Sequence, residues 1–115
     1  MSSEARDWLS HMIENLERIA SYIGDPPDLD RLEDSKTRDA IERCLERISE
    51  AASRFDRAGI DLAAMAPEVP WSDIRAFGNY LRHEYDGLDE DVVTGTVRHD
   101  LGPLRAAVGA LKDRF

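Results

Sequence analysis

Two long stretches of the sequence place apolar residues three or four positions apart, and this spacing constrains the fold more than any other feature. The first stretch covers residues 4–23 and the second covers residues 35–57. Such spacing puts the apolar side chains on one stripe of an α-helix. Each stretch therefore predicts an amphipathic helix that must bury one face, and two long helices of this kind favour a bundle.

The ends of these helices are set by residues that cap or interrupt helical structure. Gly24, followed by Asp-Pro-Pro-Asp, ends the first helix, and Gly59 ends the second. Ser35 is the predicted N-cap of the second helix. Residues 29–35 are expected to hold one short helical turn, and residues 60–70, with two prolines, are expected to form a connecting loop or a brief turn.

The C-terminal half continues the helical pattern. A third helix is predicted to begin near Pro70 and to stop around residues 86–87, and the acidic residues 89–91 favour the start of another helix. A kink or a re-initiated helix is expected at residues 100–103, because a proline interrupts the hydrogen-bond ladder. No stretch shows the sustained alternation of a strand. Residues 1–115 are therefore predicted to form a single all-α domain, a bundle of four to five helices with antiparallel long helices.

Charge and composition limit the classes of function. The net charge of −9 repels phosphate backbones at long range, which argues against a general nucleic-acid binder but is compatible with a small local basic site. Cys44 is the single cysteine and lies in the apolar stripe of the second helix, so we expect a core residue and an intracellular, cytoplasmic protein. No membrane span is expected, because no apolar run approaches the required length of roughly 20 residues. No signal peptide is expected either, because the N-terminus MSSEARDWLSHM has no basic region followed by an apolar one.

The usual motifs for metal and cofactor chemistry are not apparent. His11, His83 and His99 are far apart in the sequence, and a second cysteine is absent, so no metal site is predicted. No glycine-rich phosphate loop and no nucleophile elbow precede a helix, and no cofactor is expected. His11 and His99 are interpreted as surface or helix-end residues.

The third helix separates a broad apolar face from a narrow polar stripe. At about 100° per residue, the apolar face comprises Trp71, Ile74, Phe77, Gly78, Leu81 and Tyr85. The polar stripe comprises Arg75, Asn79, Arg82 and Asp86, with His83 at its edge. Gly78 would allow a neighbouring helix to approach closely.

The polar stripe could handle a phosphodiester, although such a stripe is also the ordinary solvated face of a helix. Arginine matches two phosphate oxygens and stabilises developing negative charge. Histidine exchanges a proton near neutral pH, and asparagine can orient a hydroxyl or the imidazole. With RNA as substrate the nucleophile is the 2′-hydroxyl of the RNA itself, so neither a metal nor a protein nucleophile is needed.

The stretch PWSDIRAFGNYLRHEYDGLDEDVVTGTVRHDLGPLRAAV resembles the C-terminal half of HepT-like proteins, a branch of the HEPN superfamily. Similar landmarks are the Pro-Trp start, Asn79, the His83-x-Tyr85 pair, the Gly-Leu-Asp turn at 87–89 and the DLGPLRAAV helix. DSKTRDAIERCLERISEAA is similar to the second helix of the family. The resemblance covers about residues 4–112.

The resemblance implies a HEPN-type helical bundle that forms a homodimer and acts as a metal-independent endoribonuclease with an R-x4-H motif. It also implies a toxin paired with an MNT-type nucleotidyltransferase antitoxin, which silences the toxin by transferring AMP to a tyrosine. His83 would be the acid/base, Asn79 the polar residue that follows the motif arginine, and Tyr85 the AMP acceptor. We expect the helix at 70–87, with Trp71, Phe77 and Leu81 on its apolar face, to lie at or near the dimer interface.

One position departs from the family pattern. The motif arginine would stand at residue 78, where this chain has Gly78. Arg82, which adjoins His83, is the first candidate to supply the cation, and Arg75 is the second. Two alternatives remain open: a catalytically degenerate HEPN protein that binds a nucleotidyltransferase partner or RNA without cleavage, and a purely structural helical oligomer.

Overall fold

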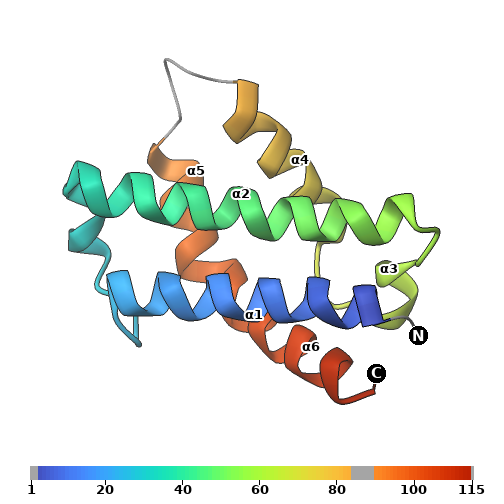
Figure 1. Ribbon diagram of the computed structural model, residues 1–115. Helices are drawn as coiled ribbons and strands as arrows, with labels where there is room; N and C mark the ends of the chain where they lie inside the picture. Colours follow the sequence, from blue (N-terminus) through green and yellow to red (C-terminus); the bar gives the residue numbers. More distant parts are fainter. Residues whose placement is uncertain (1–2, 84–89, 115) are drawn as a thin grey trace.

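The computed structural model describes residues 3–83 and 90–114, and all regular structure in these residues is helical (Figure 1). In chain order the elements are α1 (Ser3–Ile23), the 3₁₀ turn η1 (Leu29–Glu33), α2 (Ser35–Arg57), α3 (Leu62–Met65), α4 (Trp71–His83), α5 (Glu90–Gly95), the π-helical segment η2 (Thr96–Asp100) and α6 (Leu101–Arg114). The prediction of an all-α bundle is confirmed.

Helix α2 is the central element of the bundle. It runs antiparallel to α1 along almost its whole length, and α4 packs on another side of it, while α6 packs on α1 (Figure 1). The ring of Trp8 meets the ring of Phe55 edge to face, with 5.1 Å between the centroids, and fixes one end of the α1–α2 pair. None of the described helices has the length and apolar character needed to cross a membrane.

The helix ends agree with the sequence except at one cap. Gly24 and Gly59 both have positive φ angles, of 91° and 76°, which is the conformation that ends a helix most easily at glycine. The N-cap of α2 is Asp34, not Ser35 as predicted. The Asp34 carboxylate accepts hydrogen bonds from the backbone N–H of Thr37 at 3.0 Å and from its hydroxyl at 2.8 Å. These two bonds lower the pKa of Asp34, so an ionised carboxylate caps the helix where Ser35 would offer a neutral hydroxyl.

Two connections position the second half of the chain. Trp71 is buried at the start of α4, and its indole Nε1 donates to the carbonyl oxygen of Ala66 at 2.9 Å, which anchors the helix to the preceding loop. The expected turns at 29–35 and 60–70 appear as η1 and α3. The interruption expected near 100–103 appears as the π-helical segment just before α6. The expected end of α4 at 86–87 lies outside the described residues.

Helix α4 approaches α2 closely at Gly78, as the sequence predicts. Gly78 is buried, and a Cβ atom placed there would collide with the Oγ and Cβ atoms of Ser49 on α2. Ser49 is fully buried, and its hydroxyl donates across the contact to the carbonyl oxygen of Arg75 at 3.4 Å. The glycine and the small hydroxyl residue together set the distance between the two helices.

We predict that Gly78→Ala destabilises the protein by about 1–3 kcal/mol, because the added methyl group must displace Ser49. Gly109→Ala is the matched control, since Gly109 is inside α6 and nothing lies within 4 Å of its Cβ position. There the usual gain in helix propensity, about 1 kcal/mol, should appear as stabilisation. Denaturant unfolding measures both effects.

A double variant tests the cause. Ser49→Gly removes the atoms that Gly78→Ala would meet, so the alanine should cost much less in that background. An equal cost of Gly78→Ala in both backgrounds would contradict the contact.

Candidate active site

The polar stripe of α4 lies beside its buried face, near the C-terminal end of the helix. Asn79, Arg82 and His83 are exposed, and Arg75 is half-buried two turns before Arg82. Arg82 and His83 occupy the last described turn, where cations are favourable to the helix dipole. Tyr85, the fifth sequence-predicted site residue, lies outside the described residues.

The position of the family's motif arginine has no room for a side chain. Because Gly78 presses on Ser49, an arginine there would require α4 to move away from α2. Replacing Gly78 by arginine is therefore expected to disturb the bundle rather than to restore a motif. Glycine at residue 78 is a packing requirement of this chain.

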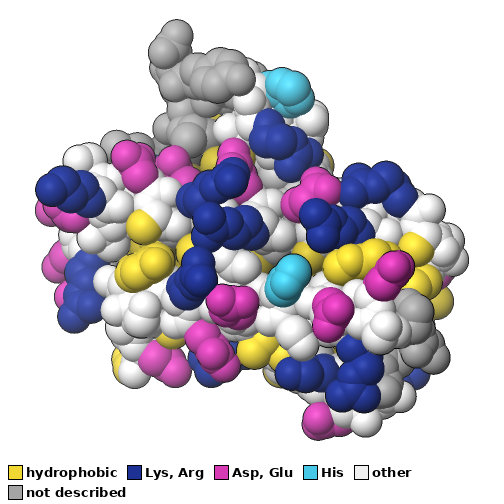
Figure 2. Space-filling model, viewed as in Figure 1, with side chains coloured by type: hydrophobic (Ala, Val, Ile, Leu, Met, Phe, Trp, Pro, Cys, Tyr) yellow, Lys and Arg dark blue, Asp and Glu magenta, His cyan; other side chains and the backbone are white. Residues whose placement is uncertain are grey.

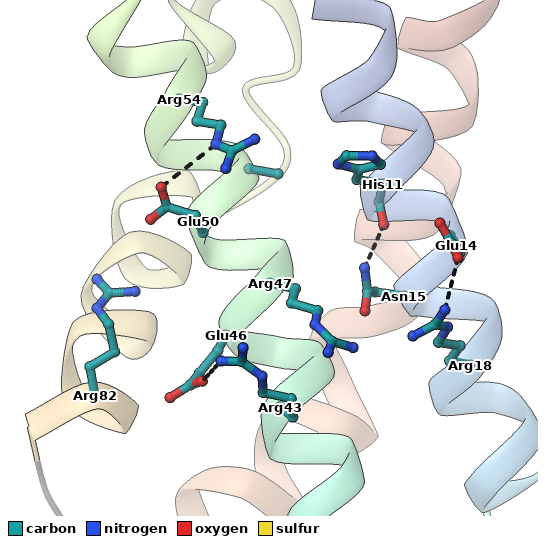
Figure 3. Close-up of a pocket in the computed structure, with 11 residues that line it drawn as sticks. His11, Glu14, Asn15, Arg18, Arg43, Glu46, Arg47, Glu50, Arg54 and Arg82 are labelled. Carbon is teal, nitrogen blue, oxygen red and sulfur yellow. Dashed lines mark hydrogen bonds and ion pairs between the residues drawn. The ribbon is translucent and has the colours of Figure 1, made fainter.

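Arg82 brings a cation to the neighbourhood of Gly78. Its guanidinium Nη1 lies 3.5 Å from the point at which a Cβ of Gly78 would stand. Figure 3 shows the Arg82 side chain running back along α4 toward the N-terminal end of the helix. Side chains in an α-helix lean in that direction, so a residue covers the surface one turn before its own Cα atom.

Arg75 faces a different part of the surface. It lines a small cavity of about 200 Å³ with Asp56 and Asp61, at the C-terminal end of α2. The structure thus separates the two arginines that the sequence offers as substitutes. Arg82 is next to His83 and near Gly78, and Arg75 is beside two carboxylates.

Arg82 also forms one wall of a groove of about 580 Å³ between α1, α2 and α4 (Figure 3). The groove is lined by His11, Glu14, Asn15, Arg18, Arg43, Glu46, Arg47, Glu50, Ala51, Arg54 and Arg82. Five arginines against three glutamates leave an excess of two positive charges, whereas the whole chain carries −9. Figure 2 shows basic side chains gathered over the middle of α2, interspersed with acidic ones.

The carboxylates of the groove neutralise some of its arginines. Glu14 pairs with Arg18 at 2.9 Å and Glu46 with Arg43 at 2.8 Å. Glu50 lies 2.8 Å from Arg57 and 3.7 Å from Arg54. The hydrogen bond from Arg57 is the main reason why the pKa of Glu50 is lowered, and the nearby charges of Arg57, Arg54 and Arg82 act in the same direction. Glu50 is therefore an ionised partner at neutral pH.

Two arginines of the groove remain without such a partner. Among the side chains that the structure describes, those of residues 3–83 and 92–114, neither Arg47 nor Arg82 has a carboxylate within ion-pair distance. Asn79 and His83 do not line the groove. Both are exposed on α4, and His83 directly follows Arg82 in the sequence.

The sequence analysis interpreted the charged residues of the second helix as a solvated face with supporting ion pairs. The ion pairs are present, but the groove between this face and α1 was missed. The available signal was the spacing of Arg43, Arg47 and Arg54, which lie four and seven residues apart on one stripe. Cys44 is buried as predicted, and burial raises the pKa of its thiol. The described residues contain no cluster of three or more metal-binding side chains.

An apolar cavity of about 470 Å³ lies on another side of α4. It is lined by Leu45, Ile48, Pro70, Asp73, Ile74, Ala76, Phe77, Tyr80, Val92, Thr96, Asp100, Leu101 and Leu104. Phe77 and Tyr80 are stacked, with 6.5 Å between the ring centroids, and Val92 is 39% exposed. Trp71 and Leu81, which the sequence analysis placed on an interface, are instead buried in the protomer's own core.

Comparison with known proteins identifies one family. A family model described as "Ribonuclease HepT-like" matches residues 12–111. A probable ribonuclease HepT of Thermococcus cleftensis is 30% identical over 97% of this chain and 99% of its own length. A putative RNase of Methanocaldococcus jannaschii is 29% identical over 78% of this chain and 72% of its own length. No solved structure gives a significant match.

Proposed function

The chain belongs to the ribonuclease HepT-like family, and from this premise we propose that it is a metal-independent endoribonuclease, the toxin of a HEPN/MNT toxin–antitoxin pair. The names of two relatives describe ribonucleases and support RNA as the substrate. A groove with an excess of positive charge on an acidic chain supports binding of a polyanion next to α4. The proposal treats residues 1–115 as one domain that acts in the cytoplasm.

The proposed reaction uses a nucleophile from the substrate. His83 takes the proton of a ribose 2′-hydroxyl, which attacks the adjacent phosphorus, and the bond from phosphorus to the 5′-oxygen of the next nucleotide breaks. This oxygen takes a proton from solvent water, and His83 returns its proton to the solvent. The products are a 2′,3′-cyclic phosphate and a 5′-hydroxyl. Arg82 stabilises the charge that develops on the phosphoryl oxygens, and Asn79 orients the hydroxyl or the imidazole.

The observation that carries this assignment is the position of Arg82 beside Gly78. The family pattern requires a cation at residue 78, and the guanidinium of Arg82 reaches to 3.5 Å from the Cβ position of that residue. Arg75 is the less favoured substitute, because it lines a separate cavity with Asp56 and Asp61.

We expect purified protein to cleave single-stranded RNA in the presence of EDTA. His83→Ala should reduce the rate by about 100- to 10,000-fold, and Arg82→Ala by about 100- to 1,000-fold. Arg75→Ala should have a much smaller effect. His83 and Arg82 are exposed, so their replacement should change stability by less than about half a kcal/mol. Gel assays of RNA cleavage and thermal melts provide the two readouts.

Gly78 also favours one rival function, a degenerate member that binds RNA or a nucleotidyltransferase without cutting. Absence of cleavage by wild type, together with retained binding, would support that rival. Undiminished cleavage by His83→Ala would exclude the catalytic role of the histidine. Absence of both cleavage and binding would leave a structural oligomer as the function.

The apolar cavity beside Phe77 and Tyr80 supports a homodimer in which a second copy covers this side of α4. Val92→Asp, which places a carboxylate at the exposed edge of the cavity, should convert the dimer to monomer in sedimentation experiments. Tyr22→Asp is the control, because Tyr22 is similarly exposed at 37% but lies at the end of α1. Only a 13.0 kDa species in wild type at tens of micromolar would contradict the dimer.

The proposed partner is an MNT-type nucleotidyltransferase antitoxin that transfers AMP to Tyr85. After co-expression with the partner, mass spectrometry should find AMP on the peptide that contains Tyr85, and Tyr85→Phe should remove the modification. Tyr80→Phe, five positions earlier in the sequence, is the matched control and should leave it in place. AMP on another residue, or no AMP with an active partner, would contradict the assignment of Tyr85 as the acceptor.

A further inference from the structure

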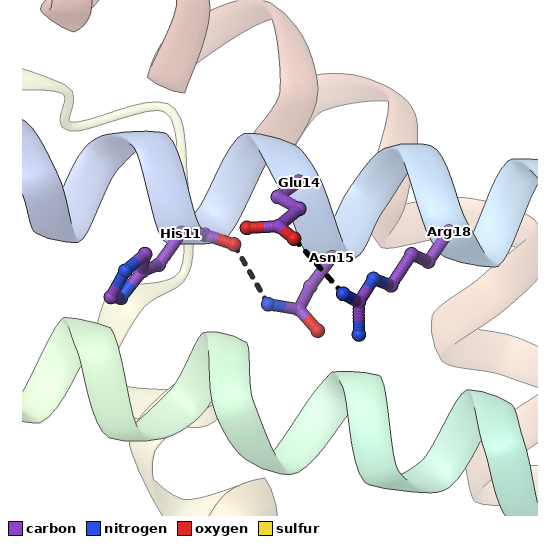
Figure 4. A network of polar contacts seen from close by, with 4 residues as sticks. All are labelled: His11, Glu14, Asn15 and Arg18. Atoms are coloured by element: carbon purple, nitrogen blue, oxygen red, sulfur yellow. Dashed lines mark hydrogen bonds and ion pairs between the residues drawn. The ribbon is translucent and has the colours of Figure 1, made fainter.

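Asn15 is a buried polar residue whose hydrogen bonding is incomplete. Its side chain is 6% exposed and lines the groove between α1 and α2. The amide Nδ2 donates to the carbonyl oxygen of His11 at 2.8 Å, as Figure 4 shows. The amide oxygen Oδ1 is buried and has no hydrogen-bond partner in the described part of the chain. Such an acceptor is rare in a native protein, where bound water or a ligand commonly supplies the donor.

The same groove contains the two arginines that lack a carboxylate. Arg47 extends from α2 toward Asn15 on α1, and Arg82 lines the groove from α4 (Figure 3). Arg18, Arg43 and Arg54 are held by ion pairs and define the walls. Since Arg47 is exposed and has a long side chain, it can shift to admit a ligand to the Asn15 amide.

These groups require a ligand that has both an anion and a hydrogen-bond donor. A phosphodiester alone offers no donor to the Asn15 oxygen. A nucleotide offers both, because its phosphate matches the guanidinium groups and its ribose hydroxyl or exocyclic amine can donate to the amide. An acidic peptide has similar groups, but Arg82 links this groove to the end of α4, where the RNA-cleaving site is proposed.

We propose that the groove between α1, α2 and α4 binds one nucleotide of a single-stranded RNA, with Arg47 and Arg82 on the phosphate and Asn15 accepting a hydrogen bond from the sugar or base. This inference rests on the proposed function, because it takes RNA as the substrate. Single strands are favoured since their base edges and hydroxyls are accessible to side chains. Arg82 is shared with the proposed reaction, whereas Arg47 and Asn15 hold the RNA beside the reacting phosphate without taking part in the chemical step.

Binding of a fluorescent single-stranded RNA tests the proposal, measured by anisotropy in a His83→Ala background that prevents cleavage. Arg47→Ala should weaken binding at least about fivefold and reduce the slope of log affinity against log salt by about 0.7, one phosphate contact. Arg105→Ala is the matched control, because it removes the same charge from an exposed position on α6. It should leave the salt slope unchanged.

Asn15→Leu provides an uncharged second variant. It removes the unpaired acceptor at similar volume, so affinity for RNA should fall while the salt slope stays the same. Competition by 5′-AMP distinguishes the source of the nucleotide. Displacement of RNA by millimolar 5′-AMP, abolished in Arg47→Ala, would show that a free nucleotide suffices, and failure to compete would show that a strand is needed. Either outcome supports a nucleotide site.

Other outcomes overturn the inference. Equal losses in Arg47→Ala and Arg105→Ala would indicate general electrostatic attraction. Stronger competition by oligoglutamate than by RNA of equal charge would assign the groove to a protein. The proposed function fails separately: wild type that never cleaves RNA would contradict it, even if Arg47 controls binding. Cleavage that depends on His83 but has a KM unaffected by Arg47→Ala would contradict only the groove.

Discussion

The contact between Gly78 and Ser49 sets the position of α4 on α2, and the arrangement of charged groups follows from that distance. With any larger residue at 78, α4 would move outward and carry Arg82 away from the arginines of α2. With glycine there, the helices meet almost backbone to side chain, and the Ser49 hydroxyl still satisfies its donor on the carbonyl oxygen of Arg75. The close packing of α4 on α2 and the basic groove that these helices share with α1 therefore both depend on Gly78.

The groove shows how an acidic protein can present a local site for an anion. Glu14, Glu46 and Glu50 hold three arginines in place rather than cancelling the whole group, and Arg47 and Arg82 form no ion pair with the side chains that the structure describes. Salt shortens the reach of the remaining acidic residues to about 10 Å at 0.1 M, so the potential inside the groove depends mainly on its own walls. The net charge of −9 then limits binding elsewhere on the surface.

Local sequence signals predicted most of the fold. The stretches 4–23 and 35–57 agree within one residue with α1 and α2, because apolar spacing and terminal glycines act within a single helix. The cap at Ser35 was wrong since Asp34, one residue earlier, receives two hydrogen bonds from Thr37. Both Asp34 and Ser35 are suitable N-cap residues, and the sequence does not show which side chain reaches Thr37.

The candidate site was less predictable, because it depends on how helices pair. Helical spacing placed Arg75 and Arg82 on one stripe, but the structure divides them between two cavities. The burial of Trp71 and the position of Asn15 in the same groove as the arginines of α2 also depend on tertiary packing. Gly78 was recognised as a point of close approach from its lack of a side chain, yet the residue that it meets could not be named.

The reach of Arg82 has a consequence for how family motifs are compared. A motif is written as residue types at fixed sequence positions. The stabilisation of a reacting group depends instead on the positions of the charged atoms around it. In this helix Arg82 leans back toward the N-terminus, so that its guanidinium lies beside residue 78, one turn before its own Cα atom. Residue 78 is a glycine in the sequence, yet the Arg82 Nη1 atom lies 3.5 Å from the point where its Cβ atom would stand. Helical motifs are therefore better compared by the location of the functional group than by column.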